Sequence, residues 1–288
     1  MLERLLICTD LDRTLIPNGS EPESSGARGH FARLAGRTQV TLAYVSGRHR
    51  DLIEDAITRY DLPVPDFVLG DVGTTIYHVG PRHDWELQPD WEQEIARDWN
   101  GLSGADLEPV LRDLPDLRLQ ERSRQNIHKL SYYVPIQADR DRLAGQIKYR
   151  LDSLNVSARL VWSLDDANQV GLLDLLPARA SKYHAIEALM REQRLSCNET
   201  VFCGDSGNDI EALASPVPAV LVANSQPEVQ ALAQRLAAES GNANRLYIAK
   251  GDFMGLNGNY SGGMLEGIAH FFPDTVEWMG FTTGESGT

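Results

Sequence analysis

The sequence predicts an α/β protein, in which a doubly wound, Rossmann-like parallel sheet is interrupted by an inserted α+β segment. Short apolar runs at residues 5–9, 40–45 and 200–203 each end in a polar turn. Segments with helical spacing of apolar residues separate these runs. Strands that alternate with helices favour a parallel sheet. Residues 81–177 follow a different pattern, which indicates an insertion into that sheet.

The three apolar runs have the character of strands that are buried on both faces. Each run is almost continuously apolar instead of alternating, which is typical of central parallel strands. Two further strands are expected at residues 219–223 and 246–249. In a sheet of this kind, ligands bind at the carboxyl ends of the strands, and the polar turns fall there. The expected helical faces carry Leu52, Ile53, Ala56, Ile57, Tyr60, Ile186, Leu189 and Met190.

The insertion divides the chain into an expected core, residues 1–80 and 178–288, and an expected second domain, residues 81–177. Its hinges are expected near Gly80-Pro81 and Leu176-Pro177. Its first element is predicted to be one helix that carries Trp85, Trp91 and Trp99. The other expected elements are a strand at residues 128–134, a helix at 140–151 and strands at 158–162 and 170–176.

The charge balance restricts the partners. The 288 residues include 41 acidic and 27 basic side chains, which give a net charge of −14. Such a field repels nucleic acid and anionic membranes, so we expect neither as a partner. A phosphate site would therefore need local positive potential, such as a divalent cation and a lysine. The chain has neither a secretory leader pattern nor an apolar run of about 18 residues, so the expected location is cytoplasmic.

Asp10 and Asp12 directly follow the first expected strand. Residues i and i+2 project the same way at a strand end, so the two carboxylates should lie close together. They would repel each other unless a cation lay between them, and oxygen ligands suit Mg²⁺. One carboxylate could then attack phosphorus, and the other could protonate the leaving alcohol. The alternative is an Asp-x-Asp turn that caps a helix, and this pair alone does not decide between the two.

Residues 204–209 give a stronger signal after the third run. Asp205 would complete the cation site, with Asp209 behind it directly or through water. Ser206 and Asn208 would fix the geometry of these carboxylates. A glycine-rich turn with a capping aspartate is the alternative, and the Asp10 pair earlier in the chain disfavours it.

Two further signals point to phosphate. Ser46, Gly47 and Arg48 offer a hydroxyl and backbone N–H groups at the expected start of a helix, which is a typical phosphate site. An N-cap serine would look the same. Lys182 opens a later helix, where the helix dipole disfavours a cation. A lysine there is more easily explained as a phosphate ligand that also shields Asp10.

The order of these motifs resembles that of the haloacid dehalogenase superfamily of phosphatases. Residues 10–14 resemble its first motif, Ser46 its second, Lys182 its third and residues 204–209 its fourth. The insertion between the second and third motifs resembles a Cof-type cap. Within that branch the chain is most similar to the sucrose-6-phosphate phosphatases, through residues 42–48, 72–77, 129–132, 174–177, 222–228 and 263–271.

The resemblance implies a Mg²⁺-dependent phosphatase that hydrolyses sucrose 6-phosphate through an aspartyl-phosphate. It implies that Asp10 is the nucleophile and that Asp12 is the acid/base, with Ser46 and Lys182 as further catalytic residues. The implied Mg²⁺ ligands are Asp10, Asp12 (through its backbone carbonyl), Asp205 and Asp209. The implied phosphate and substrate contacts are Ser46, Gly47, Arg48, Lys129, Ser131, Tyr132, Asp174, Lys182 and Asn208. The expected partner is a small-molecule sugar phosphate, and a sucrose-phosphate synthase is a candidate protein partner.

The chain departs from the family pattern at three positions. Arg13 occupies a place that often holds a small or amide residue, and Tyr183 follows the lysine where glycine is frequent. Leu172 stands where a second acidic residue often precedes Asp174 by two positions. Arg13 and Leu172 favour the alternative of a phosphatase for another glycosyl or hexose phosphate. An alternative of a different class is a non-catalytic sugar-phosphate-binding module that docks to a synthase.

Overall fold

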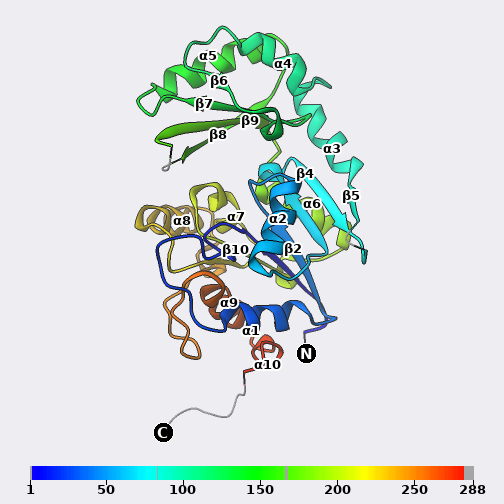
Figure 1. Cartoon of the computed structure of the whole chain (residues 1–288), viewed down its shortest axis with the longest axis vertical. Helices are drawn as coiled ribbons and strands as arrows, with labels where there is room; N and C mark the ends of the chain where they lie inside the picture. Colours follow the sequence, from blue (N-terminus) through cyan, green and yellow to red (C-terminus); the bar gives the residue numbers. More distant parts are fainter. Residues whose placement is uncertain (1, 83, 166–167, 282–288) are drawn as a thin grey trace.

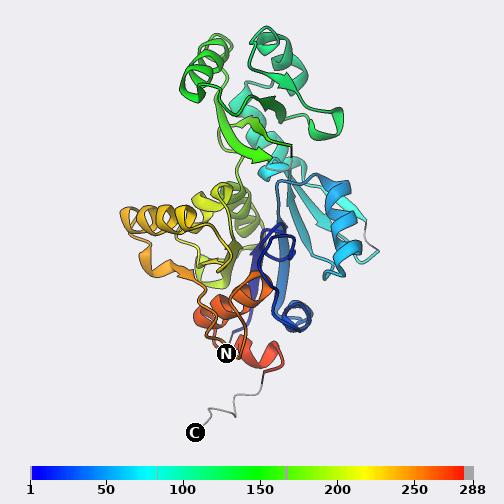
Figure 2. The ribbon, with the colours of Figure 1, turned by 60° about the vertical axis from the view of Figure 1, so that its left-hand side comes forward.

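The computed structural model describes residues 2–82, 84–165 and 168–281. Its strands form an eight-stranded sheet, in the order β12-β11-β10-β1-β2-β3-β4-β5, and a four-stranded sheet (Figures 1 and 2). The strands of the larger sheet are β1 (Leu5–Thr9), β2 (Val40–Val45), β3 (Phe67–Gly70), β4 (Thr75–Val79), β5 (Trp85–Leu87), β10 (Thr200–Gly204), β11 (Ala219–Leu221) and β12 (Leu246–Ile248).

The part of the larger sheet from β12 to β3 is parallel, and β4 and β5 add an antiparallel edge. All five residues of β1 are buried, as the continuous apolar run predicts. Thr9 at its end pairs with Cys203 of β10 and with Tyr44 of β2. Three central strands therefore end at one level, and the residues that follow them meet.

Helices cover both faces of the larger sheet. The core on one face includes Phe31 of α1, Ile53 of α2 and Met264 of α9, and the core on the other includes Ile186 of α6 and Ala233 of α8. The predicted doubly wound fold is thus confirmed. The helices around this sheet are α1 (Ala27–Ala35), α2 (Arg50–Tyr60), α3 (Pro89–Ala96), α6 (Lys182–Gln193), α7 (Ile210–Leu213), α8 (Pro227–Glu239), α9 (Tyr260–Phe271) and α10 (Thr275–Trp278). None of the helices in the described ranges has the length and apolar character to span a membrane.

The smaller sheet is antiparallel, in the order β6-β7-β9-β8, and it confirms the predicted α+β insertion. Figure 1 shows α4 and α5 on the side of this sheet that faces away from the larger one. The other side faces the larger sheet. The elements are α4 (Gly104–Leu111), β6 (Arg118–Leu119), β7 (Leu130–Val134), α5 (Arg140–Asp152), β8 (Ala158–Asp165) and β9 (Val170–Pro177).

The prediction of one helix that carries three tryptophans is wrong. Trp85 lies in β5, Trp91 in α3 and Trp99 in the short 3₁₀ helix η2 (Arg97–Trp99). Their spacing reflects burial in two different cores, because Trp91 packs under the larger sheet and Trp99 under the smaller one. The domain limits at residues 80 and 178 stay predictions, and β5 belongs to the larger sheet.

Candidate active site

The carboxyl ends of the central strands bring together side chains that lie far apart in the sequence. Asp10 follows β1, and its backbone N–H donates to the carbonyl of Cys203 in β10 at 2.9 Å. Ser46 follows β2, and Asp205 follows β10. Lys182 is the first residue of α6, because Ser181 caps that helix by accepting a hydrogen bond from the backbone of His184. The predicted convergence of these polar turns is therefore what the structure shows.

Three buried carboxylates form the centre of the site. Asp10, Asp205 and Asp209 each offer an oxygen, and these oxygens lie within 4.8 Å of one another. The Nζ of Lys182 lies 2.8 Å from Oδ2 of Asp10 and 2.7 Å from Oδ1 of Asp209. Lys182 is itself only 1% exposed. The half-exposed Arg13 places its Nε 3.4 Å from Oδ2 of Asp205. The lysine alone does not balance the buried negative charge.

The excess of buried negative charge raises the pKa values of two of these carboxyls. Burial, together with the neighbouring carboxylates, raises the pKa of Asp10 to about 8, although Lys182 opposes the rise. Burial and Asp209 raise the pKa of Asp205 to about 7. A divalent cation would remove this cost, and a set of carboxylate oxygens is the donor set that Mg²⁺ prefers. The residues at this edge of the sheet therefore fit a Mg²⁺ site.

We expect Mg²⁺ binding to release protons and to tighten as the pH rises from 6 to 8. Without metal, the raised pKa values of about 8 for Asp10 and about 7 for Asp205 leave these carboxyls partly protonated in this range, and a ligand must be deprotonated. Affinity should rise roughly tenfold per pH unit for each proton displaced. Calorimetric titration with MgCl₂ in two buffers of different protonation enthalpy would count these protons. An affinity that did not change over this range would contradict the shared site.

Asp209 is held more tightly by the protein than the other two carboxylates. Its Oδ1 accepts a hydrogen bond from Lys182, and its Oδ2 accepts from the backbone N–H of Asp205 and from the N–H and hydroxyl of Ser206, all at 2.7–3.1 Å. Both oxygens are thus occupied. Asp209 is therefore better suited to orienting Asp205 and Lys182 than to a direct place on the metal.

Asp12 points toward the second strand. Arg48 contacts its carboxylate with both Nε and Nη2, at 2.7 and 2.6 Å, and Asn18 donates to it at 2.6 Å. Burial alone would raise the pKa of Asp12, but these donors lower it below its ordinary value. Arg48, which the sequence assigned to phosphate or substrate, therefore holds the predicted acid/base residue instead.

The turn after β2 differs in one respect from the prediction. Helix α2 begins at Arg50 with His49 as its cap, so Ser46 does not start that helix. The Ser46 hydroxyl accepts the backbone N–H of Arg48 at 3.2 Å, and its own carbonyl accepts that of Val72 at 3.1 Å. This extra turn, which helical spacing alone does not indicate, holds Ser46 at the end of β2, the strand next to β1, which Asp10 follows.

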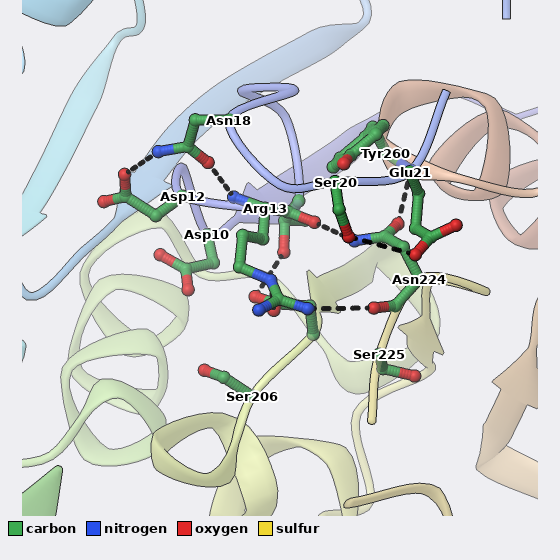
Figure 3. A network of polar contacts seen from close by, with 12 residues as sticks. Asp10, Asp12, Arg13, Asn18, Ser20, Glu21, Ser206, Asn224, Ser225 and Tyr260 are labelled. Atoms are coloured by element: carbon green, nitrogen blue, oxygen red, sulfur yellow. Dashed lines mark hydrogen bonds and ion pairs between the residues drawn. The ribbon is translucent and has the colours of Figure 1, made fainter. Parts of the chain in front are cut away.

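Three polar residues in the site were given no role from the sequence, although Thr14 and Asn224 lie in segments that carry the family resemblance. The Thr14 hydroxyl donates to Asp205 at 3.1 Å, and Asn18 accepts the backbone N–H of Arg13 at 2.8 Å. Asn224 exchanges hydrogen bonds with Arg13 through its carbonyl and its side-chain amide (Figure 3). Asn224 closely follows β11, so the rule that polar groups follow buried strands could have found it. Arg13 has a positive φ of 58°, which turns the chain so that its guanidinium reaches Asp205 and Asn224.

The smaller sheet places its predicted substrate residues on different faces. Ser131 of β7 pairs with Asp174 of β9, and the Ser131 hydroxyl donates to the Asp174 carboxylate. Tyr132, one residue on, packs with Leu173 in the core beneath α4 and α5, and only 3% of it is exposed. Because strand side chains alternate between faces, Ser131 and Asp174 face the larger sheet, whereas Tyr132 faces away from it. The structure therefore does not bring Tyr132 to the substrate side.

Lys129 and Asn208 each have a partner within the protein. Lys129 is buried, and its Nζ lies 3.2 Å from Asp71 in η1 (Asp71–Gly73). The sequence assigned Lys129 to contact with the sugar, and in the structure its charge is paired with Asp71. Asn208 lies in η5 (Gly207–Asp209), and its side chain accepts the Ser206 hydroxyl at 2.8 Å. Between β8 and α7 a cleft of about 810 Å³ reaches Lys182 and Asn208. A sugar-sized molecule fits this volume.

Comparison with known proteins identifies the family. A model of the sucrose-6F-phosphate phosphohydrolase family matches residues 3–272. A HAD-like hydrolase of Nitrosococcus oceani is 52% identical over 97% of this chain and 75% of its own length. Mannosylfructose-phosphate phosphatase of Agrobacterium fabrum is 30% identical over 80% of this chain and 87% of its own. Sucrose-phosphatase 1 of Nicotiana tabacum is 28% identical over 93% of this chain, which spans 59% of the tobacco protein.

A solved structure gives the same result. The sucrose-phosphatase of Synechocystis sp. PCC6803, in complex with sucrose and phosphate, is 28% identical and superposes with a TM-score of 0.73, over 93% of this chain and 98% of that one. The resemblance noted from the motifs is thereby confirmed over the whole fold. This chain belongs to the sucrose-6F-phosphate phosphohydrolase family, within the haloacid dehalogenase superfamily of phosphatases.

Proposed function

We propose that this protein is a Mg²⁺-dependent sugar-phosphate phosphatase, and that its substrate is sucrose 6-phosphate. The observation that most supports this proposal is the geometry of Asp10, a buried carboxylate that contacts the buried Lys182 at 2.8 Å beside the Asp205 carboxylate. Membership of the family supports the phosphatase activity. The Synechocystis relative, solved with sucrose and phosphate, supports the choice of sugar.

Asp10 is proposed to act as the nucleophile. One of its oxygens forms a bond to phosphorus while the bond from phosphorus to the sugar oxygen breaks, which leaves an aspartyl-phosphate. The backbone N–H of Leu11 donates to Asp10 Oδ1 at 2.7 Å, and Lys182 contacts Oδ2, so the carboxylate has a fixed orientation. Water then attacks phosphorus, the bond to Asp10 breaks, and phosphate leaves.

Asp12 is proposed to move the protons. In the first step it gives a proton to the sugar oxygen as that oxygen leaves phosphorus, and in the second step it takes a proton from the attacking water. Asp12 must therefore carry a proton at the start of the first step, and it regains that proton from the attacking water in the second; the Arg48 and Asn18 contacts favour the ionised form, which is the form that takes up this proton. The same residue therefore serves both steps.

Lys182 and Ser46 are proposed to bind the phosphoryl oxygens. Lys182 carries the buried positive charge next to Asp10, and the Ser46 hydroxyl lies at the neighbouring strand end. Mg²⁺ bound by Asp10, Asp205 and the backbone carbonyl of Asp12 would shield the negative charge of the phosphate from that of the nucleophile. Preorganised positive groups of this kind stabilise the charge that develops in phosphoryl transfer.

The sugar is proposed to lie against the face of the smaller sheet that carries Ser131 and Asp174. We propose that residues 81–177 act as a cap over the site and exclude water when the substrate is bound. Leu172 pairs with Tyr133 and lies on the same face, two residues before Asp174. An apolar side chain here replaces a hydrogen-bond partner that related phosphatases often provide, so the sugar contacts differ in detail.

The Agrobacterium relative favours a second candidate, a mannosylfructose phosphate, because that protein is named for this substrate. Purified protein with MgCl₂ should release phosphate from sucrose 6-phosphate at least about tenfold faster than from glucose 6-phosphate or fructose 6-phosphate, because a second sugar ring adds contacts to the cap. Faster release from mannosylfructose phosphate would select the second candidate. Equal rates on all esters would contradict specificity for a disaccharide.

The same panel distinguishes a phosphatase from a non-catalytic module that only binds sugar phosphate. The Asp10→Asn variant is the matched control, since it keeps the size of the side chain and loses the nucleophile. Phosphate release above about 1% of the wild-type rate in this variant would contradict the role of Asp10 as nucleophile. No release from any ester with MgCl₂ would contradict the proposed activity and favour a non-catalytic module, for which binding to a sucrose-phosphate synthase is the next measurement.

A further inference from the structure

A loop with an unusual backbone joins the phosphate turn to the smaller sheet. Asp71, Val72 and Gly73 are consecutive residues with positive φ angles of 51°, 61° and 88°. A positive φ is uncommon outside glycine and is a clear outlier for a β-branched residue such as Val72. Such conformations persist only where surrounding contacts fix them, and they gather at functional sites. The contacts on both sides of this loop are therefore informative.

On the side of the larger sheet, the loop contacts the groups that surround the phosphate site. The backbone N–H of Asp71 donates to the carbonyl of Arg48 at 2.9 Å, and that of Val72 donates to the carbonyl of Ser46 at 3.1 Å. A Cβ atom on Gly73 would lie 2.9 Å from the backbone nitrogen of Lys182, so glycine allows α6 to start against the loop. The position of this loop thus fixes the Ser46–Arg48 turn.

On the other side, the loop is tied to the smaller sheet. Lys129 Nζ lies 3.2 Å from Asp71 Oδ1, and the exposed fractions of the two side chains are only 5% and 7%. The Asn126 amide also donates to the Thr74 hydroxyl at 2.8 Å. Both donors belong to the turn just before β7, the strand that carries Ser131. A buried charge pair of this kind tolerates little change in geometry.

We propose that Asp71 is a positioning residue, which couples the placement of the smaller sheet to the orientation of Asp12. The contacts run from Lys129 to Asp71, from the Asp71 backbone to Arg48, and from the Arg48 guanidinium to the Asp12 carboxylate at 2.6 and 2.7 Å. When the cap sits in place, Arg48 holds Asp12 where it can serve the leaving sugar. This inference rests on the proposed phosphatase activity.

Asp71→Asn tests the proposal, because asparagine also accepts a positive φ and keeps the backbone N–H, but lacks the charge that holds Lys129. We expect kcat on sucrose 6-phosphate to fall about 10- to 100-fold, the loss expected when a catalytic group is displaced by about 1 Å. Release of p-nitrophenolate in the first turnover on p-nitrophenyl phosphate should fall less than about threefold, because p-nitrophenolate leaves without a proton from Asp12, and the water step that uses Asp12 comes later.

Two controls distinguish an effect of Asp71 on the position of Asp12 from an effect only on how the smaller sheet contacts the larger one. Asp98→Asn breaks another ion pair near the junction, that of the buried Asp98 with the half-exposed Arg179; among the described residues, neither contacts Ser46 or Arg48. It should leave the ratio of the two rates unchanged. In the Asp12→Asn background, Asp71→Asn should add less than about a twofold loss of kcat, because both act through one group.

Each other outcome overturns the inference. An equal loss on both esters would place the effect of Asp71 on the nucleophile or the fold, and no loss would make the pair only a docking contact. The same selective loss in Asp98→Asn, or full additivity with Asp12→Asn, would also overturn it. Failure of the wild-type protein to hydrolyse either ester is a different result, because that would overturn the proposed phosphatase activity itself.

Discussion

Asp10→Asn should abolish phosphatase activity while leaving the metal-free protein at least as stable as wild type. The amide cannot form an aspartyl-phosphate, and loss of a catalytic nucleophile typically costs about 10⁴-fold or more in kcat. In the folded protein without metal, however, the ionised Asp10 carboxylate lowers stability, because burial raises its pKa to about 8. Phosphate release with saturating MgCl₂ and thermal unfolding in EDTA measure the two effects.

The stability effect should depend on pH. The pKa of Asp10 is higher in the folded protein than in the unfolded chain, so the folded state holds its proton up to about pH 8. The contribution of this group is therefore fully present below about pH 4 and is lost as the pH rises through 8. Relative to wild type, Asp10→Asn should gain at least about 1 kcal/mol between pH 5 and pH 8.5, or about 2–4 °C in Tm.

Magnesium provides the control for this prediction. MgCl₂ should raise the Tm of the wild-type protein at pH 8.5 more than that of Asp10→Asn, because the variant has lost one ligand. If the variant had a lower Tm than wild type in EDTA at pH 8.5, the Asp10 carboxylate would not destabilise the metal-free protein. Residual activity above about 1% of wild type would remove Asp10 from the role of nucleophile.

The sequence predicted the centre of the site because of how parallel sheets are built. Asp10, Ser46 and Asp205 each follow a buried strand, and the ends of neighbouring parallel strands lie at one edge. Lys182 was assigned to the same site because the helix dipole disfavours a cation at the start of a helix, so its position there indicated a ligand. The doubly wound fold followed from the same buried runs, which is why fold and central residues were predicted together.

The periphery of the site was less predictable, because it depends on which face a residue takes and on contacts between distant loops. Tyr132 differs from Ser131 by one position, and a shift of one residue moves a strand side chain to the other face. The Asp71 partner of Lys129 lies 58 positions away in a loop with positive φ angles, for which no local pattern exists. The contact of Arg48 with Asp12 likewise crosses between strands.

Lys182→Met should have the largest combined effect on stability and rate. Burial alone would lower the pKa of Lys182, but Asp10 and Asp209 raise it, so the lysine is charged within the cluster. Removing one partner of a buried ionic group typically costs about 3–5 kcal/mol, because the remaining charges are left uncompensated. Loss of a preorganised positive group should also lower kcat about 10³-fold. Thermal unfolding in EDTA and phosphate release with MgCl₂ measure both.

The destabilisation should grow with pH and shrink with metal. Lys182 opposes the rise in the pKa of Asp10, so without the lysine this carboxyl must be neutralised by a proton, and the loss of stability should be small at pH 5 and largest at pH 8.5. MgCl₂ should restore part of the Tm, since a second cation enters the same cluster, but it should not restore kcat. Lys129→Met is the matched control, because Lys129 is buried against Asp71, outside the three carboxylates. Its stability loss should not respond to MgCl₂. If Lys182→Met were equally indifferent to Mg²⁺, the lysine and the metal would not share one cluster of charge.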